Sequence, residues 1–161
     1  MTTSTDQDPA LLGALRGLTD RAEIGELLDR YLLDFDILLD QPRDDDRYRR
    51  IFTEDLRLTF PVGGHRGVAG LAAFQRTAKS QWARTQHLST NHVIDLDPDH
   101  DPDRARLRAR LLVAHVHPDG GPPEPFTAGS HIDAQAVRTE QGWRLRELTI
   151  HLIWTTGRRP A

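Results

Sequence analysis

The segment Arg104–His117 alternates between apolar residues and arginines. Because successive side chains of a β-strand point to opposite faces, this pattern predicts a strand with one buried and one solvated face. A strand of this kind needs a sheet beside it and a layer that covers its apolar face. The same alternation predicts that the side chain of His115 points into the interior. The buried face would carry Leu107, Ala109, Leu111, Val113, His115 and His117, and the opposite face Arg106, Arg108 and Arg110.

Other periodic segments extend the prediction to a whole domain. Apolar residues recur with helical spacing after Thr19 or Asp20, and Asp20 with Glu23 has the spacing of a capping box. Helices followed by an antiparallel meander predict an α+β fold in which the helices pack on one face of a curved sheet. We expect a flexible segment at 1–18 and one domain at 19–157. We expect helices at 10–18, from 19 or 20 to about 39, at about 44–52 and at 67–84, and strands at 56–62, 85–96, 104–117, 126–138 and 143–155.

Composition narrows the class of protein. The 161 residues fit one domain, and the absence of cysteine excludes disulfides, thiolate metal sites and thiol nucleophiles. A net charge of -3 argues against a nucleic-acid partner. No apolar run is long enough to span a membrane, and the polar N-terminus is unlike a signal peptide, so we expect a cytoplasmic protein. Lys79 is the only lysine, which we attribute to a codon bias.

Three polar residues are candidates for proton-transfer chemistry. His87 and His115 lie on expected strands, and Asp36 lies near the end of the long helix. Histidine gives or takes a proton near neutral pH without a metal. We expect Asp36 to orient His115 through a hydrogen bond while His87 acts as general acid or base. The simpler interpretations are a core histidine bonded to a carbonyl oxygen and a solvated carboxylate.

Other polar side chains accompany these three. His131 and Asp133 are two residues apart on one expected strand, so they share a face, which we place inside the fold. Asn91 shares the strand parity of His87 and would orient a substrate oxygen, unless it occupies a bulge or turn. His151 is expected at the pocket or at a subunit interface. No histidine pair has helical metal-site spacing, and we expect neither a metal nor another cofactor.

Several motifs resemble those of a known family. They are Arg84–His87, Val113–His115, Phe35-Asp36, the strand Leu56–Phe60 and the tryptophans Trp143 and Trp154. Through them the chain resembles, from Thr19 to Trp154, the SnoaL-like branch of the nuclear transport factor 2-like (NTF2-like) superfamily, and within it the scytalone dehydratases. The resemblance implies a cone-shaped α+β barrel around a deep pocket, with His87 and His115 as catalytic residues. Asp133 falls near a position where many SnoaL-like proteins have aspartate.

The departures from the family concern the pocket. Two tyrosines that hold a water against the substrate carbonyl in the dehydratases are replaced here by Phe35 and Phe60, which cannot donate a hydrogen bond. We therefore expect a substrate other than scytalone. We expect a pocket lined by Tyr31, Phe35, Phe60, Trp82, Asn91, His131, Asp133, His151 and Trp154.

These observations predict a cofactor-independent lyase or isomerase that moves protons on a small cyclic, polyketide-like compound of secondary metabolism. Two alternatives stay open. One is a non-catalytic module that binds a small molecule or a partner, and the other is an epoxide hydrolase with Asp36 and Asp133 as its carboxylates. The resemblance also implies a homo-oligomer, a dimer or trimer, that associates through the outer sheet face around Leu112 and Val116.

Overall fold

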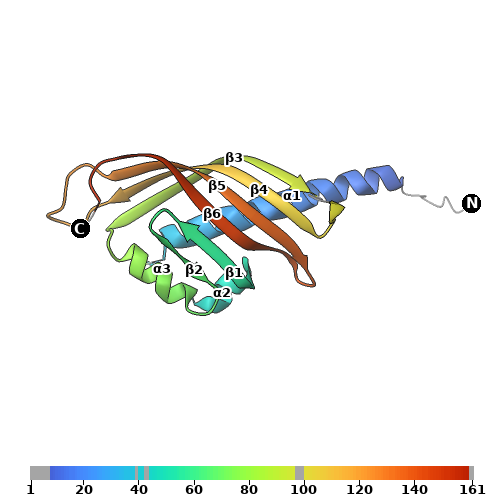
Figure 1. Cartoon of the computed structure of the whole chain (residues 1–161), viewed down its shortest axis with the longest axis horizontal. Coiled ribbons are helices and arrows are strands. Elements are labelled where there is room, and N and C mark those ends of the chain that lie inside the picture. The colour runs from blue at the N-terminus through green and yellow to red at the C-terminus, as the bar shows by residue number, and fades with distance from the viewer. Residues whose placement is uncertain (1–7, 39, 42–43, 97–99, 160–161) are drawn as a thin grey trace, which may run out of the picture.

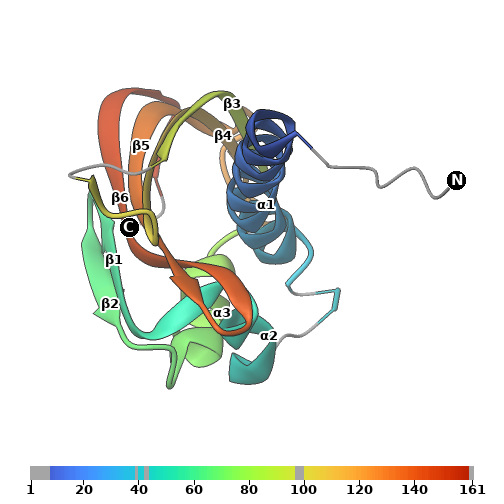
Figure 2. The same cartoon turned by 90° about the vertical axis from the view of Figure 1, so that its right-hand side faces the viewer.

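Three helices and six strands make up the described part of the chain, in a computed structural model that places residues 8–38, 40–41, 44–96 and 100–159. All six strands join one curved sheet, and α1 lies along its concave side (Figure 1 and Figure 2). The predicted α+β arrangement is therefore confirmed. The helices are α1 (Pro9–Asp36), α2 (Asp45–Arg49) and α3 (Leu71–Lys79). The strands are β1 (Phe52–Phe60), β2 (Gly63–Arg66), β3 (Arg84–Leu96), β4 (Arg104–Val116), β5 (Phe126–Thr139) and β6 (Gly142–Thr156).

The sheet is mixed, not antiparallel throughout. Its strand order is β2-β1-β6-β5-β4-β3, in which β3 to β6 form the expected antiparallel meander and β1 runs parallel to β6. The prediction is wrong at this junction because β1 and β6 are far apart in the sequence, and the chain between them forms the long crossover that parallel neighbours need. Register shifts in the β3·β4 and β5·β6 pairings mark bulges, which bend the strands.

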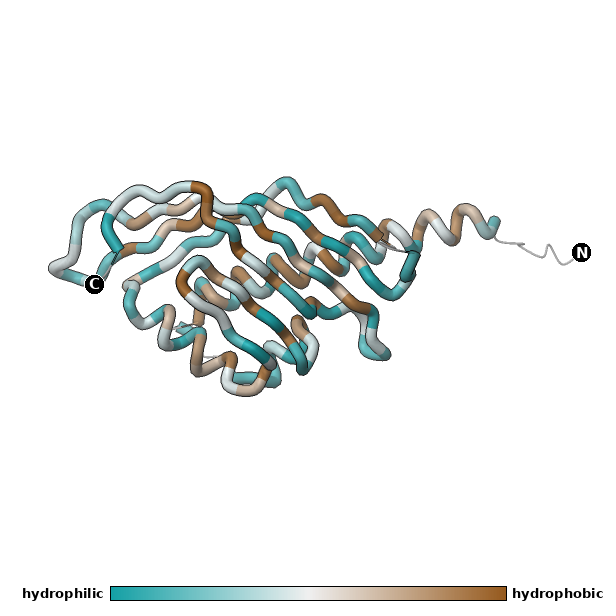
Figure 3. Tube along the Cα trace, in the orientation of Figure 1, coloured by the Kyte–Doolittle hydropathy of each residue, from teal (hydrophilic) through white to brown (hydrophobic). Residues whose placement is uncertain are grey.

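The inner face of the sheet forms one side of the core. Leu107 and Leu111 of β4 are buried and the arginines between them are exposed, as the alternation predicts. Figure 3 shows a similar change between hydrophobic and hydrophilic residues along the other strands. Ile24, Leu28 and Leu32 of α1 are buried in the same cluster. The helix therefore supplies the layer that the alternating strand requires.

The N-terminal helix is continuous across the boundary that the sequence suggests near residue 19. Its first turn is capped by Asp8, whose side chain accepts a hydrogen bond from Ala10, and Pro9 occupies the first helical position. Residues 10–18 are thus not a separate helix, and the proposed flexible segment is helical from Pro9 onwards; residues 1–7 lie outside the described part. No helix in the described ranges is both long and apolar enough to cross a membrane.

Asp20 links the helix to the sheet and does not cap a helix as predicted. It is buried, and its carboxylate accepts hydrogen bonds from the indole nitrogen of Trp143 at 2.9 Å and from Arg138 at 2.7 Å. The bond from the Arg138 guanidinium holds the pKa of the Asp20 carboxyl below its usual range. A carboxylate in the core is tolerated because both of its oxygens are paired.

Asp20→Ala is expected to lower the free energy of unfolding by about 2–4 kcal/mol, because the buried indole N–H of Trp143 would lose its acceptor and Arg138 would keep only its longer ion pair with Asp103. Glu26→Ala on the same helix is the matched control, since it removes only an exposed ion pair with Arg30 and should cost less than about 1 kcal/mol. Urea denaturation measures both. Equal costs for the two variants would contradict the structural role of Asp20.

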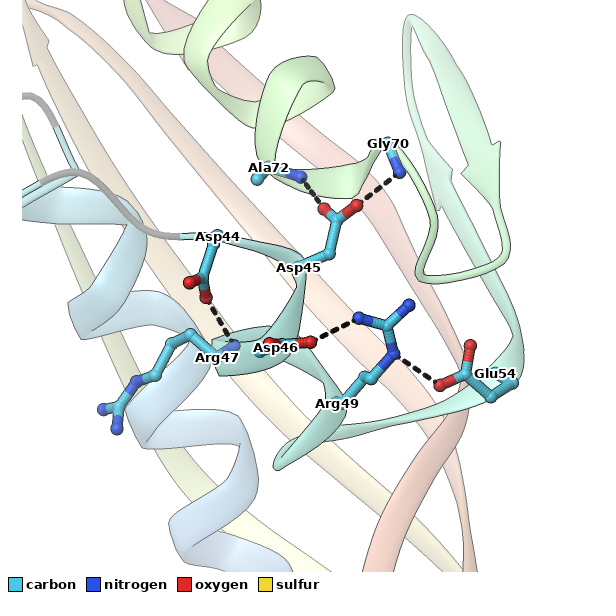
Figure 4. Close-up of polar contacts among 8 residues, drawn as sticks. All are labelled: Asp44, Asp45, Asp46, Arg47, Arg49, Glu54, Gly70 and Ala72. Atoms are coloured by element: carbon cyan, nitrogen blue, oxygen red, sulfur yellow. Dashed lines mark hydrogen bonds and ion pairs between the residues drawn. The ribbon is translucent and has the colours of Figure 1, made fainter.

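A run of three aspartates organises the two short helices (Figure 4). Asp44 caps α2 by accepting a hydrogen bond from the Arg47 backbone amide at 3.0 Å. Asp45 accepts hydrogen bonds from the backbone amides of Gly70 at 2.8 Å and Ala72 at 2.9 Å. Since the N-cap residue of α3 is a glycine without a side chain, Asp45 supplies the missing cap from another helix. The run therefore starts α2, as the sequence predicts, and also joins it to α3.

Other boundaries differ from the sequence prediction in this region. Phe52 begins β1 and does not end a helix, and α3 begins only at Leu71. The Gly63-Gly64 pair forms the start of β2 and is more than a turn. A Cβ at Gly64 would collide with the carbonyl oxygen of Leu58, so glycine is required where β1 and β2 approach each other.

The outer face of the sheet carries an apolar row. Leu88, Leu112 and Trp154 lie in register across the sheet, with Gly129 between the last two, and each is roughly half exposed. The Trp154 ring covers Gly129, where a Cβ would collide with it. An exposed apolar row of this kind is typical of an interaction surface. Self-association through this face stays a prediction.

Candidate active site

Asp36 and His87 form the centre of a polar cluster where the end of α1 meets β3. The imidazole Nδ1 of His87 lies 2.6 Å from Asp36 Oδ1, and the backbone amide of His87 donates to Asp36 Oδ2 at 2.8 Å. The hydroxyl of Thr85 also donates to Oδ1 at 2.8 Å. Three donors therefore converge on one carboxylate. Both side chains of the pair are largely buried, with 11% and 14% of their surfaces exposed.

The carboxylate is stabilised in its charged form. Partial burial raises the pKa of Asp36, but the hydrogen bonds and the charge of His87, with the bond from Thr85, outweigh it and bring the pKa below its usual range. A charged Asp36 carboxylate accepts a hydrogen bond from the protonated Nδ1 of His87. The ring is thereby fixed in the tautomer that leaves a lone pair on Nε2. This is the geometry of a general base held in place by an orienting carboxylate.

His115 is beside this pair but is not bonded to Asp36, so the predicted Asp36–His115 pairing is wrong. Its ring centroid lies 5.5 Å from that of His87, 4.6 Å from that of Trp82 and 5.9 Å from that of Phe126. Burial among these rings, together with the charges of His87 and Lys79, lowers the pKa of His115 to about 4. At neutral pH the ring is therefore uncharged. Its Nδ1 is buried without a hydrogen-bond partner within the described ranges.

His115 should make the protein less stable in acid. In the unfolded chain a histidine titrates near 6.5, whereas in the folded protein the pKa is about 4, so between these values only the unfolded state binds the proton. Stability is therefore lost as the pH falls from 6.5 towards 4. We expect the wild type to lose about 1–2 kcal/mol more than His115→Phe between pH 7 and pH 4.5, since part of the ring still contacts solvent. Urea denaturation at both pH values measures the difference, and parallel losses would refute it.

Lys79 belongs to the cluster and was missed by the sequence analysis. Its ammonium group donates to the backbone carbonyl of Asp36 at 2.7 Å and contacts the hydroxyl of Thr85. The side chain is almost fully buried, and burial lowers the pKa of Lys79. Its Nζ also lies 5.4 Å from the ring centroid of Phe35. The only lysine of an arginine-rich chain was the available signal, and codon bias does not explain its position.

Aromatic rings form the apolar part of the cluster. Phe35 packs edge-on against His87, with 5.1 Å between ring centroids, and Trp82 is buried beside His115. Both were predicted to line the site, and the structure brings both to the histidines. Two other predicted wall residues lie elsewhere among the described contacts: Tyr31 is a core residue whose hydroxyl accepts a bond from Gln75, and Phe60 stacks on Phe74.

Two residues of β3 are placed differently from the prediction. Asn91 is exposed and has a φ of 54°, within the register shift between Thr90 and Val93, so it shapes a bulge and does not face His87. His92, expected outside, packs against Gly25 of α1 and hydrogen-bonds Ser89 at 3.0 Å. The bulge explains both errors, because it interrupts the alternation of side chains from which the facing of Asn91 and His92 was predicted.

The predicted inner position of His131 and Asp133 is wrong, and of the two places expected for His151 the structure excludes the pocket. Their neighbours Ile132 and Ala134 are buried on the inner face of β5, so the alternating residues His131 and Asp133 lie on the outer face, and His151 pairs directly with His131. Trp154 is on the same outer face, over Gly129. These four residues are therefore separated from His87 by the thickness of the sheet. The remaining carboxylate of interest, Asp34, is buried in an ion pair with Arg47 at 2.7 Å.

A cleft of about 230 Å³ lies away from the histidines. It is lined by residues of α1, of α2 and the turn after it, and of the start of β6, among them Glu26, Arg47 and Arg144. Its volume is below the roughly 300–1,000 Å³ of typical small-molecule sites. The deep pocket around the histidines, which the family resemblance implies, stays a prediction.

Comparison with known proteins gives the family. A family model described as a SnoaL-like domain matches residues 16–149. Among proteins of curated function, none matches this sequence. The solved structure of Kfla4162 from Kribbella flavida is 29% identical, with a TM-score of 0.74 over 87% of this chain and 95% of that chain.

Two further solved structures share the fold at lower identity. A candidate scytalone dehydratase from Novosphingobium aromaticivorans is 16% identical, with a TM-score of 0.73 over 90% of this chain and 91% of that chain. A hexachlorocyclohexane dehydrochlorinase from Novosphingobium barchaimii is 19% identical, with a TM-score of 0.72 over 89% of this chain and 92% of that chain. At these identities the likeness concerns the α+β cone alone. With most of its length matched by the family model, the chain belongs to the SnoaL-like domain family.

Proposed function

We propose that the protein is a cofactor-independent lyase that removes a small leaving group from a cyclic substrate, with His87 as the general base. The observation that supports this most directly is the 2.6 Å contact between His87 Nδ1 and Asp36, which leaves Nε2 as the proton acceptor. The names of the two structural neighbours, a dehydratase and a dehydrochlorinase, both denote eliminations. The substrate we favour is a small oxygenated ring compound of secondary metabolism.

The reaction proceeds without an external reactant. Nε2 of His87 takes a proton from a ring carbon, the electrons of that C–H bond form a C=C bond, and the leaving group departs from the adjacent carbon with its bonding pair. The imidazolium formed on His87 is stabilised by the Asp36 carboxylate. For a hydroxyl leaving group, the same imidazolium returns the proton and water is released. If no group leaves and the imidazolium returns the proton to another carbon of the conjugated system, the C=C bond changes position and the net result is an isomerisation.

His115 plays a different part from the one the sequence suggests. With a pKa of about 4 it is neutral at pH 7, so it is not the acid that protonates the leaving group. A neutral imidazole carries one proton, and since Nδ1 is buried without a partner, the lower-cost tautomer has that proton on Nε2. We assign this Nε2–H to a substrate oxygen. Phe35 and Trp82 would exclude water from the reacting carbon.

The alternatives fit the geometry less well. An epoxide hydrolase built on Asp36 and Asp133 is contradicted, because Asp133 lies on the outer face of the sheet while Asp36 contacts the inner-face residue His87. A non-catalytic binding module would need no oriented imidazole. A module of this kind would nevertheless have the same fold, because fold does not determine function.

Two substrates of known chemistry test the proposal. The first is a cyclic β-hydroxyketone, whose loss of water gives an enone that absorbs in the ultraviolet. The second is hexachlorocyclohexane, whose elimination releases chloride. We expect turnover of at least one ring compound of this kind and its loss in His87→Gln. Saturable binding of such compounds without turnover, at any pH from 6 to 9, would favour the binding module.

A further inference from the structure

His131, Asp133 and His151 form a compact cluster on the outer face of the sheet that no part of the proposed reaction uses. His131 and His151 are directly opposite each other in the antiparallel β5·β6 pair, and Asp133 is two residues along on the same face of β5. The ligand atoms of all three side chains lie within 4.8 Å of one another. Two rigid strands therefore hold two imidazoles and a carboxylate together.

We propose that this cluster is a binding site for a divalent transition metal ion, with Zn²⁺ as the best match. Two imidazole nitrogens and one carboxylate oxygen are the ligand set that Zn²⁺ accepts in three-residue sites, where water occupies the fourth position. The cluster is partly open to solvent, with about 30–46% of the side-chain surfaces exposed, so the ion has access and a water ligand has room.

The distances favour a bridging ion over direct hydrogen bonds. Asp133 Oδ2 lies 3.8 Å from His131 Nε2 and 3.7 Å from His151 Nε2, which is too long for a hydrogen bond in either case. Ligands at about 2.0–2.2 Å from a tetrahedral Zn²⁺ lie about 3.3–3.5 Å from each other. Small rotations of the two rings, now stacked with 4.5 Å between centroids, would bring their nitrogens to this spacing.

A neighbouring arginine orients the carboxylate. Arg106 of β4 donates to Asp133 Oδ1 at 3.2 Å, which leaves Oδ2 directed at the two histidines. Groups that hold a metal ligand in place in this way commonly contribute to affinity. The nearby positive charge of Arg106 is partly offset by this bond, and Arg108 is paired with Asp95 at 3.0 Å. Arg110, directly opposite His131, is the remaining basic neighbour that would weaken cation binding.

Titration of the full, untagged chain with Zn²⁺ against a chromophoric chelator tests the proposal. We expect one Zn²⁺ per chain, and at least tenfold weaker binding in His131→Ala, in His151→Ala and in Asp133→Asn. Two variants should bind as the wild type does: His100→Asn, which removes an exposed histidine but keeps a residue that tolerates the positive φ of 59°, and His87→Gln, which alters the proposed active site.

A second measurement reports the geometry without any enzymatic activity. Co²⁺ in a four-coordinate site absorbs far more strongly in the visible range than the hydrated ion, so this absorption should appear with the wild type and vanish with the double variant His131→Ala/His151→Ala. Unchanged affinity in that double variant would overturn the proposal, as would the absence of Zn²⁺ binding by the wild type. Loss of binding in His87→Gln but not in His131→Ala would place the ion at the other cluster and overturn it equally.

Discussion

His87→Gln is expected to lower kcat/KM for elimination by about 10²–10⁴-fold, the range that a positioned general base typically contributes. Glutamine has no nitrogen lone pair that can take a proton, but it can still donate a hydrogen bond to Asp36. The fold should therefore survive, and KM should change less than kcat. Steady-state kinetics with the substrate identified from the ring compounds, together with a thermal unfolding curve, measures both effects.

The matched control lies on the same strand. His92→Gln makes the same substitution at a histidine that packs against α1 and contacts neither Asp36 nor His115 in any described interaction. It should leave kcat/KM within a few-fold of the wild type. If folded His87→Gln kept its activity, or if both variants lost activity equally while folded, His87 would not be the base.

The strands β3 to β6 could be predicted from the sequence because each carries its own pattern, whereas β2 was expected as a turn. β4 to β6 appear within one or two residues of the expected boundaries, since alternation depends only on which face is buried. The long-range order of the sheet was harder. Nothing in the segment 52–60 indicates that it will pair with the last strand of the chain, because that pairing depends on where the intervening helix and meander place it.

The three catalytic candidates lie close together as predicted, but the bonding among them was predicted wrongly and Lys79 was missed. His87 and His115 come together because β3 and β4 pair in a register that puts Thr85 opposite His115 and His87 opposite Val113. Asp36 at the end of α1 packs on β3, so it meets His87 and not the histidine one strand further away. The sequence alone does not specify which strand a helix end will contact.

The outer-face position of His131 and Asp133 could have been predicted from the sequence of β5. Parity shows that His131 and Asp133 share a face, yet it does not say which face. The other parity of β5, formed by Ala128, Ile132, Ala134 and Ala136, is more apolar and is the buried one. Comparing the two faces of the strand would have placed both polar residues outside, whereas the family position of Asp133 favoured the inside.

Asp36→Asn is expected to reduce kcat/KM by about 10²–10⁴-fold and to be at least as harmful as Asp36→Ala, although asparagine is closer in shape to aspartate. All three partners of the carboxylate are donors: the Thr85 hydroxyl, the His87 ring and the His87 backbone amide. The amide NH₂ of asparagine must therefore face one of them.

The orientation of the asparagine side-chain amide decides which tautomer His87 adopts. The backbone N–H of His87 cannot become an acceptor, so the NH₂ group must occupy the place of Oδ1, where the Thr85 hydroxyl can rotate. His87 Nδ1 must then accept a hydrogen bond, which moves the ring proton to Nε2 and removes the lone pair that would take the substrate proton.

Alanine at position 36 imposes no such tautomer. It leaves the ring poorly oriented but free to present a bare Nε2 for part of the time, so a residual rate is expected. Kinetics of both variants, with ring-nitrogen NMR shifts of His87 to identify the tautomer, test this argument. An asparagine variant that keeps kcat/KM within a few-fold of the wild type, or that clearly exceeds the alanine variant, would show that Asp36 does not act by fixing the tautomer of His87.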